Sequence, residues 1–70
     1  MLPVIFASNG ESGIIKKIGG SGETKQHLLD LGFVPGGEVT VVSRLGGNII
    51  LSIKGVRVAI SEELAKKIFI

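Results

Sequence analysis

The sequence predicts an all-β fold: a small five-stranded barrel with a short helix inserted between the first two strands and a short helix before the last strand. Apolar residues recur mostly with period two, which is the repeat of a half-buried strand. Glycine and asparagine separate the short apolar runs, as they do between antiparallel strands. A chain of 70 residues builds one domain, residues 1–70, around a single thin core. A sheet of this size protects its edges and its apolar face by closing into a barrel.

Five strands are expected from the alternation of apolar and polar residues. They are Ile14–Ile18, Val39–Ser43, Ile49–Ile53, Val56–Ile60 and Ile68–Ile70. In the first strand, residues 14, 16 and 18 are expected to share a face. Leu45–Asn48 is a hairpin connection in which the glycines and the asparagine can adopt a positive φ, and Lys54–Gly55 is a tighter one, so residues 39–60 are predicted to form a three-stranded meander. No pairing is predicted for residues 2–9.

Two helices are predicted from their end signals. The first covers Glu23–Leu31, with Ser21 as its N-cap and an acidic first residue where the helix dipole favours negative charge. The second lies within Ser61–Lys67, which begins with a serine and two glutamates and ends with two lysines. Gly19–Gly22 is expected to be a flexible connection into the first helix.

A sharp corner is expected directly after the first helix. If Leu31 is the last helical residue, Gly32 occupies the position that prefers a left-handed backbone, and Phe33 folds back onto Leu28. Val34–Gly37 then has proline and glycine at the two central positions of a type II turn. Together these features predict a fixed angle at which the chain enters its second strand.

The composition excludes several classes of protein. The chain has no cysteine, so it forms no disulfide or thiolate metal site, and this usage is typical of a reducing compartment. Its longest uncharged stretch is residues 1–10, whereas a membrane-spanning helix needs about 20 residues. A basic n-region is missing, so we predict no secretory signal and expect a cytoplasmic chain without direct membrane insertion. The net charge of +2 is spread along the chain, so no nucleic-acid partner is expected.

Four segments of the chain resemble a known family. Leu28–Gly36, followed by Val39, resembles the L-x-x-L/M-G-x-x-P-G-x-x-V signature of the ferrous iron transport protein A (FeoA) family. Gly10–Ile15 is similar to the opening G-x-x-G-x-I of the family, Gly46–Ile49 to its hairpin, and Gly55–Ser61 to the segment before its closing helix. The segments follow the order of the family and cover nearly the entire chain.

The resemblance implies a Src-homology-3-like (SH3-like) barrel with an accessory role rather than a catalytic one. Relatives in this family are cytoplasmic and work beside a membrane ferrous iron transporter that carries its own cytoplasmic GTPase domain. The implied function is to bind this transporter on its cytoplasmic side and to modulate it, as a monomer or weak dimer. Similar domains lie at the C-terminus of some metal-dependent transcription regulators, so the alternative is a regulatory domain that senses a transition metal.

The segment from Ser21 to Gly37, which contains the first predicted helix and the turns after it, is the expected docking surface. A helix and loops that project from a barrel can vary without disturbing its core. The candidates for partner binding are Lys25, Gln26, His27, Phe33 and Arg57. Arg57 is included because it points away from the core in its predicted strand. The family often has arginines where this chain has residues 25–27, and lysine does not reproduce the bidentate fork of arginine.

His27 is the only histidine, and a metal site built on it would need Asp30 and Glu23, which lie at i+3 and i−4 on the helix. One histidine and two acids are also what an ordinary exposed helix face contains. We therefore predict no metal site and no cofactor, and we expect any association with Fe²⁺ to be weak.

The residue spacing does not fit a phosphate-binding loop or a catalytic Ser/His/Asp set. The segment Gly19–Gln26 lacks the second glycine and the hydroxyl of the phosphate-loop template G-x-x-x-x-G-K-S/T, and it also lacks the last glycine of G-x-G-x-x-G. The serines lie at caps and turns, and the single histidine has no third group placed to orient it. The chain is therefore predicted not to be an enzyme.

Overall fold

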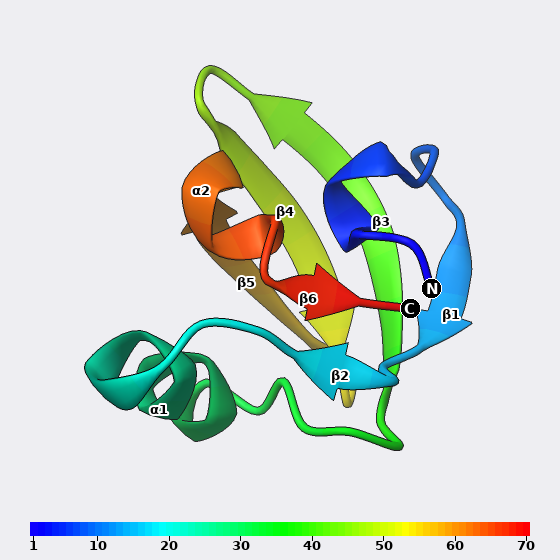
Figure 1. Ribbon diagram of the computed structural model, residues 1–70. Coiled ribbons are helices and arrows are strands. Elements are labelled where there is room, and N and C mark those ends of the chain that lie inside the picture. Colours follow the sequence, from blue (N-terminus) through cyan, green and yellow to red (C-terminus); the bar gives the residue numbers. More distant parts are fainter.

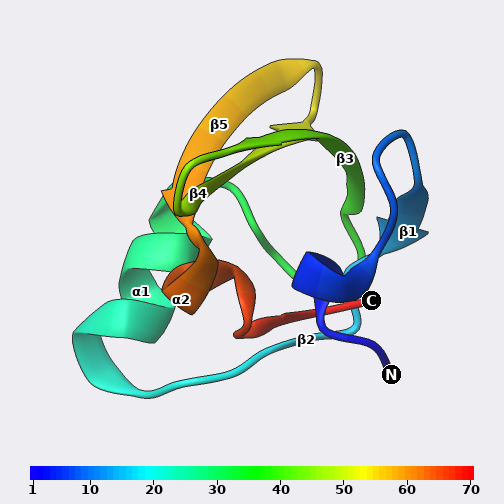
Figure 2. The same cartoon turned by 90° about the horizontal axis from the view of Figure 1, so that it is seen from above.

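The computed structural model describes all residues, 1–70, and shows a small barrel with one helix at its side (Figure 1). In chain order the elements are the 3₁₀ helix η1 (Val4–Phe6), β1 (Ser12–Ile14), β2 (Lys17–Ile18), α1 (Gly22–Asp30), β3 (Glu38–Leu45), β4 (Asn48–Ile53), β5 (Val56–Ser61), α2 (Glu62–Ala65) and β6 (Ile68–Phe69). An antiparallel sheet has the order β1-β3-β4-β5, and β2 pairs with β6. In Figure 2 the long strands curve around one side of the molecule and β2 crosses the opposite side. The predicted fold class is confirmed.

The predicted meander of residues 39–60 is also confirmed, as β3, β4 and β5. The β4–β5 register is unbroken over all six residue pairs. The β3–β4 register shifts between Val41 and Ser43, so Val42 is the extra residue of a β-bulge. A bulge bends its strand and increases the local twist, which lets the sheet curve around the core.

The first predicted strand is wrong in its extent and in its face. Residues 14–18 are divided between β1 and β2, which belong to different sheets. Ile15 and Ile18 are buried whereas Ile14 is half exposed, so residues 14, 16 and 18 do not share an inner face. The reason is a corner at Ile15, whose N–H donates to the carbonyl of Gly37 (2.8 Å) before the chain pairs with β6. The alternation therefore shifts by one residue at the point where the chain changes sheets.

The N-terminal residues, for which no pairing was predicted, extend the smaller sheet. Leu2 and Ile70 exchange two backbone hydrogen bonds of 2.8 Å each. Pro3 forms an isolated bridge with Phe69 beside them. Val4 follows and is fully buried, so this segment contributes to the core as well as to the sheet.

Arg44 on β3 joins the N-terminal segment to the larger sheet. Its Nη1 donates to Oδ1 of Asn9 (2.7 Å), and its Nη2 donates to the carbonyls of Ile5 (2.6 Å) and Ala7 (2.7 Å). The planar guanidinium carries five donors in a fixed fork, so one side chain satisfies three acceptors at once. These acceptors lie 35 to 39 residues away in sequence, and the local pattern carried no signal for them.

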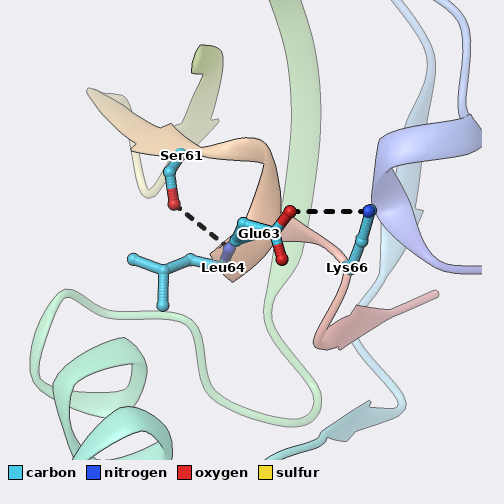
Figure 3. A network of polar contacts seen from close by, with 4 residues as sticks. All are labelled: Ser61, Glu63, Leu64 and Lys66. Carbon is cyan, nitrogen blue, oxygen red and sulfur yellow. Dashed lines mark hydrogen bonds and ion pairs between the residues drawn. The ribbon is translucent and has the colours of Figure 1, made fainter. Parts of the chain in front are cut away.

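The second helix begins as predicted and ends earlier. Ser61 caps α2, because its Oγ accepts a hydrogen bond of 3.2 Å from the backbone N–H of Leu64 (Figure 3). Lys66 Nζ lies 3.7 Å from Oε1 of Glu63, an exposed ion pair also drawn in Figure 3. Such exposed pairs contribute little to stability, so the cap is the more important of the two contacts. The helix ends at Ala65 because the chain then turns into β6.

All fourteen buried residues are apolar and form one cluster. The inner positions of β4 are buried as predicted, whereas on β5 only Ile60 is buried and Val56 is 60% exposed at the rim beside the hairpin. A single core of this size holds the strands and α1 together. None of the helices has the length and apolar character needed to cross a membrane.

The Lys54–Gly55 hairpin contains a correctable strain. Lys54 is the only residue other than glycine with a positive φ, +53°, and Gly55 follows at +78°, which together make a type I′ turn. Asn-Gly is the favoured pair in this turn because asparagine tolerates the left-handed region. We expect Lys54→Asn to raise the free energy of unfolding by about 0.5 kcal/mol, measured by urea denaturation. An unchanged or lower value for this variant would contradict the turn assignment.

Candidate docking surface

The helix α1 projects from one side of the barrel and is the most prominent element outside the two sheets (Figures 1 and 2). It begins one residue earlier than predicted and ends at Asp30, with Ser21 at the N-cap. The backbone of Ser21 is extended, as expected for a cap, but its side chain makes no capping hydrogen bond. The N-cap residue was therefore predicted correctly, whereas the expected capping hydrogen bond is missing.

The predicted corner after α1 is present in full. Gly32 has φ +107°, its N–H donates to the carbonyl of Leu29 (3.0 Å), and the N–H of Phe33 donates to the carbonyl of Leu28 (3.1 Å). These two bonds define the Schellman motif, which satisfies carbonyls left free at a helix end. The type II turn follows, with the N–H of Gly37 donating to the carbonyl of Val34 (3.0 Å). The C-terminal end of α1 is thus held at a defined angle to β3.

The first half of the glycine-rich connection into α1 contacts the barrel. The N–H of Gly19 donates to the carbonyl of Lys67 (2.6 Å). A Cβ placed on Gly20 would lie 3.0 Å from Cδ of Lys67, so the lysine side chain lies against this glycine. The tertiary structure therefore adds Lys67 to the surroundings of the α1 N-terminus, a residue that the sequence analysis did not select.

Most polar side chains of α1 are exposed to solvent. Leu28 is fully buried, and the 3.6-residue period places Gln26 and Asp30 on the opposite side of the helix and His27 on its flank. Nε2 of Gln26 donates to Oδ1 of Asp30 (2.8 Å). The side chains of Lys25 and His27 are exposed and make no hydrogen bond or ion pair within the chain. We call residues 25, 26 and 27 the α1 surface.

Phe33 was expected to bind a partner, and the structure contradicts this expectation. Its side chain is fully buried and belongs to the core cluster. The physical reason is the Schellman motif, which turns the residue after Gly32 back over the helix and into the core. Phe33 therefore supports α1 from inside and has no surface to offer to a partner.

Arg57 is exposed, but it belongs to a different part of the surface. Its cross-strand neighbour is Ser52, which is followed by Thr40 and then Ser12 along the register of the sheet. The hydroxyls of Ser12 and Thr40 share a hydrogen bond of 2.7 Å. Arg57 therefore ends a polar row across the outer face of the large sheet, and no hydrogen bond or ion pair joins it to the α1 surface.

The three candidates for a metal site are all exposed on α1. His27, Asp30 and Glu23 are not brought together, because the structure places no group of three or more His, Cys, Asp or Glu side chains where it could hold a metal ion. Asp30 is already engaged with Gln26. What the structure presents is an exposed helix face of mixed polarity on a rigid base, suited to contact with another macromolecule.

The comparisons with known proteins agree on one family. The FeoA domain model matches residues 3–70. A Methanocaldococcus jannaschii protein assigned as Fe(2+) transport protein A is 37% identical to this chain, and the match covers 100% of this chain and 85% of that protein.

Solved structures with the same fold are of two kinds. The crystal structure of an iron uptake regulatory protein (FeoA) has a TM-score of 0.85 at 35% identity, covering 96% of this chain and 89% of that one. Stenotrophomonas maltophilia FeoA complexed with zinc, described as an SH3 domain protein, has a TM-score of 0.85 at 20% identity, with 99% and 88% covered. A manganese-dependent transcriptional repressor has a TM-score of 0.86 at 17% identity, with 94% of this chain and 38% of the repressor covered. At such identities the last two likenesses show the fold alone.

Proposed function

The chain belongs to the FeoA family, and from this membership we propose that it is a cytoplasmic accessory protein of ferrous iron uptake. In this role it binds the cytoplasmic side of a membrane ferrous iron transporter with a GTPase domain and modulates the transporter. The observation that carries the proposal is the family match over residues 3–70, together with a 37% identical relative that is named for Fe(2+) transport. The chain contributes binding rather than catalysis in this proposal.

The α1 surface is proposed as the docking site. The side chains of Lys25 and His27 are exposed and make no hydrogen bond or ion pair within the chain, so a partner can engage them without displacing such an interaction. Leu28 and Phe33 hold the helix from its buried side. A helix that is already ordered loses little conformational entropy on binding, which favours affinity. Arg57 remains a secondary candidate on a separate part of the surface.

The test is a titration of the ¹⁵N-labelled chain with the cytoplasmic GTPase portion of a ferrous iron transporter. We expect shifts at residues 21–37, and we expect the double variant Lys25→Glu, His27→Glu to weaken binding by roughly tenfold, because two new negative charges oppose the charge of the wild-type surface. The matched control is Lys16→Glu, in the connection between β1 and β2. This connection lies on the side of β2 that faces away from α1 (Figure 1). The affinity of this control variant should stay close to wild type. Equal losses in both variants, or none in either, would contradict docking through α1.

A second candidate is a regulatory domain that senses a transition metal. The likeness to the manganese-dependent repressor favours it, although that likeness extends only to the fold. The same labelled sample, titrated with Fe²⁺ alone under anaerobic conditions, separates the two functions. Shifts centred on His27 with metal alone would support the sensor, whereas shifts that need the transporter fragment support the accessory protein.

A further inference from the structure

The strand β5 forms an open end of the large sheet. It is the last strand in the order β1-β3-β4-β5, and β4 is the only strand that pairs with it (Figure 2). Val56, Arg57 and Ala59 are exposed along it. None of the backbone hydrogen bonds made by loops, turns and caps reaches residues 56–61. The outer side of β5 is therefore without a partner in the chain.

The hairpin geometry identifies the free backbone groups. In a type I′ turn at Lys54–Gly55, the flanking residues Ile53 and Val56 exchange both of their hydrogen bonds. Antiparallel pairing alternates, so Val58 and Ile60 also direct their N–H and C=O groups toward β4. The N–H and C=O groups of Arg57 and Ala59 consequently point outward. We call this row the β5 edge.

The β5 edge lacks the features that usually prevent pairing between molecules. Exposed edges are commonly protected by proline, by a bulge, by several charges or by being very short. The six residues of β5 include no proline and one charge, and the register with β4 has no shift. The opposite end of the sheet, β1, is only three residues long. An edge that is regular, uncovered and this long is competent to accept another strand.

The distribution of charge indicates which strand would pair with the β5 edge. We propose that the β5 edge pairs with the β5 edge of a second copy of this chain. Lys54 precedes β5 and Arg57 is its second residue, whereas Glu62 and Glu63 follow its end, with Glu63 paired to Lys66 of its own chain. Two antiparallel copies place the basic start of one strand beside the acidic end of the other, and the two-fold axis repeats this match. The edge is thus complementary to itself in charge as well as in hydrogen bonding.

The same charges select a register with Val58 at the two-fold axis. Arg57 of each copy then faces Ala59 of the other, and these pairs exchange about four backbone hydrogen bonds. A register with Arg57 opposite Arg57 would place like charges directly across the strands, which is unfavourable. The resulting sheet would continue through both copies, with four strands from each.

The test uses two substitutions at one exposed position. Ala59→Glu places a carboxylate opposite Arg57 of the second copy and is expected to lower the dimer dissociation constant roughly fivefold, whereas Ala59→Lys is expected to raise it roughly fivefold, since each dimer contains the pair twice. Both variants add a charged side chain at the same site, so each controls for the other's effect on folding. For an interface this small, the wild-type dissociation constant should be about 0.1 to 1 mM, measured by sedimentation and by concentration-dependent ¹H–¹⁵N spectra.

In those spectra, the amides of Arg57 and Ala59 should shift most as the concentration rises. A wild-type chain that stays monomeric at about 2 mM would overturn the proposal. A strand from another protein would then be the expected partner of the β5 edge. If both substitutions weaken the dimer, the proposed register is excluded. That result would indicate a different register, in which Ala59 of one copy lies opposite Ala59 of the other. Shifts confined to α1 would also overturn the proposal.

Discussion

Phe33→Ala is expected to lower the free energy of unfolding by about 3 to 5 kcal/mol, as for other fully buried phenylalanines truncated to alanine. Phe33 is 0% exposed and is the largest of the fully buried side chains. A chain of this length has a total stability of roughly 4 to 10 kcal/mol, so the variant should be close to unfolding at room temperature. Urea denaturation followed by circular dichroism measures the loss.

Phe6→Ala is the matched control for this prediction. Phe6 is 69% exposed, so the same truncation creates no cavity and should change stability by less than about 0.5 kcal/mol. If Phe33→Ala lowered the free energy of unfolding as little as Phe6→Ala does, the buried placement of Phe33 would be contradicted. The originally expected role of Phe33 in partner binding would then be open again.

Arg44→Met should lower the free energy of unfolding by about 2 kcal/mol, because it removes three charge-assisted hydrogen bonds that are partly screened by solvent. The substitution keeps an unbranched side chain of similar length and removes the guanidinium. The carbonyls of Ile5 and Ala7 and the amide of Asn9 would lose their donor. Urea denaturation measures the total effect.

Hydrogen exchange shows where the Arg44→Met effect is located. The N–H of Gly10 donates to the carbonyl of Val41 (2.6 Å) and reports on the attachment of the N-terminal segment to β3. This amide should exchange faster in the variant. The exchange rates of the β4 amides should change only as much as the global free energy of unfolding requires. Arg57→Met, at the only other arginine, removes no hydrogen bond within the chain and should be nearly neutral at micromolar concentration. Equal losses at both positions would contradict the role assigned to Arg44.

Of these two sites, Phe33 bears on function through the helix that it helps to place. Phe33 lies at the C-terminal corner of α1, and its burial fixes the helix on the core. Arg44 instead completes the side of the barrel that contains the N-terminal segment. A variant at Phe33 that reduces transporter binding must therefore be separated from loss of folding, whereas variants of the α1 surface leave the core unchanged.

Features made by neighbouring residues could be predicted from the sequence. The Schellman corner at Gly32, the type II turn before β3 and the cap at Ser61 join residues no more than five positions apart. Their geometry depends on which backbone angles each residue can adopt and on which hydrogen bonds lie within reach. The alternation of Ile49, Leu51 and Ile53 could also be predicted, because the extra residue of the β3–β4 bulge lies on β3 and β4 itself alternates without interruption.

For the candidate site, the sequence predicted the helix and its polar residues but misplaced the aromatic one. Lys25, Gln26 and His27 are exposed, as expected for polar and charged side chains, and the helical period places Gln26 opposite the buried Leu28. The exposure of Phe33 could not be judged in the same way. It lies in a loop, where no period indicates which side chains point inward.

Only the tertiary structure decided the features that depend on distant parts of the chain. These are the division of residues 14–18 between two sheets, the pairing of Leu2 with Ile70, the three hydrogen bonds of Arg44 and the open β5 edge. Burial and pairing at these places are set by whichever remote segment occupies the adjacent space, and a residue's own preferences do not specify that neighbour. The sequence by itself therefore determined the local turns, the strands of the meander and the family, whereas packing between distant segments determined which surfaces remain free to bind.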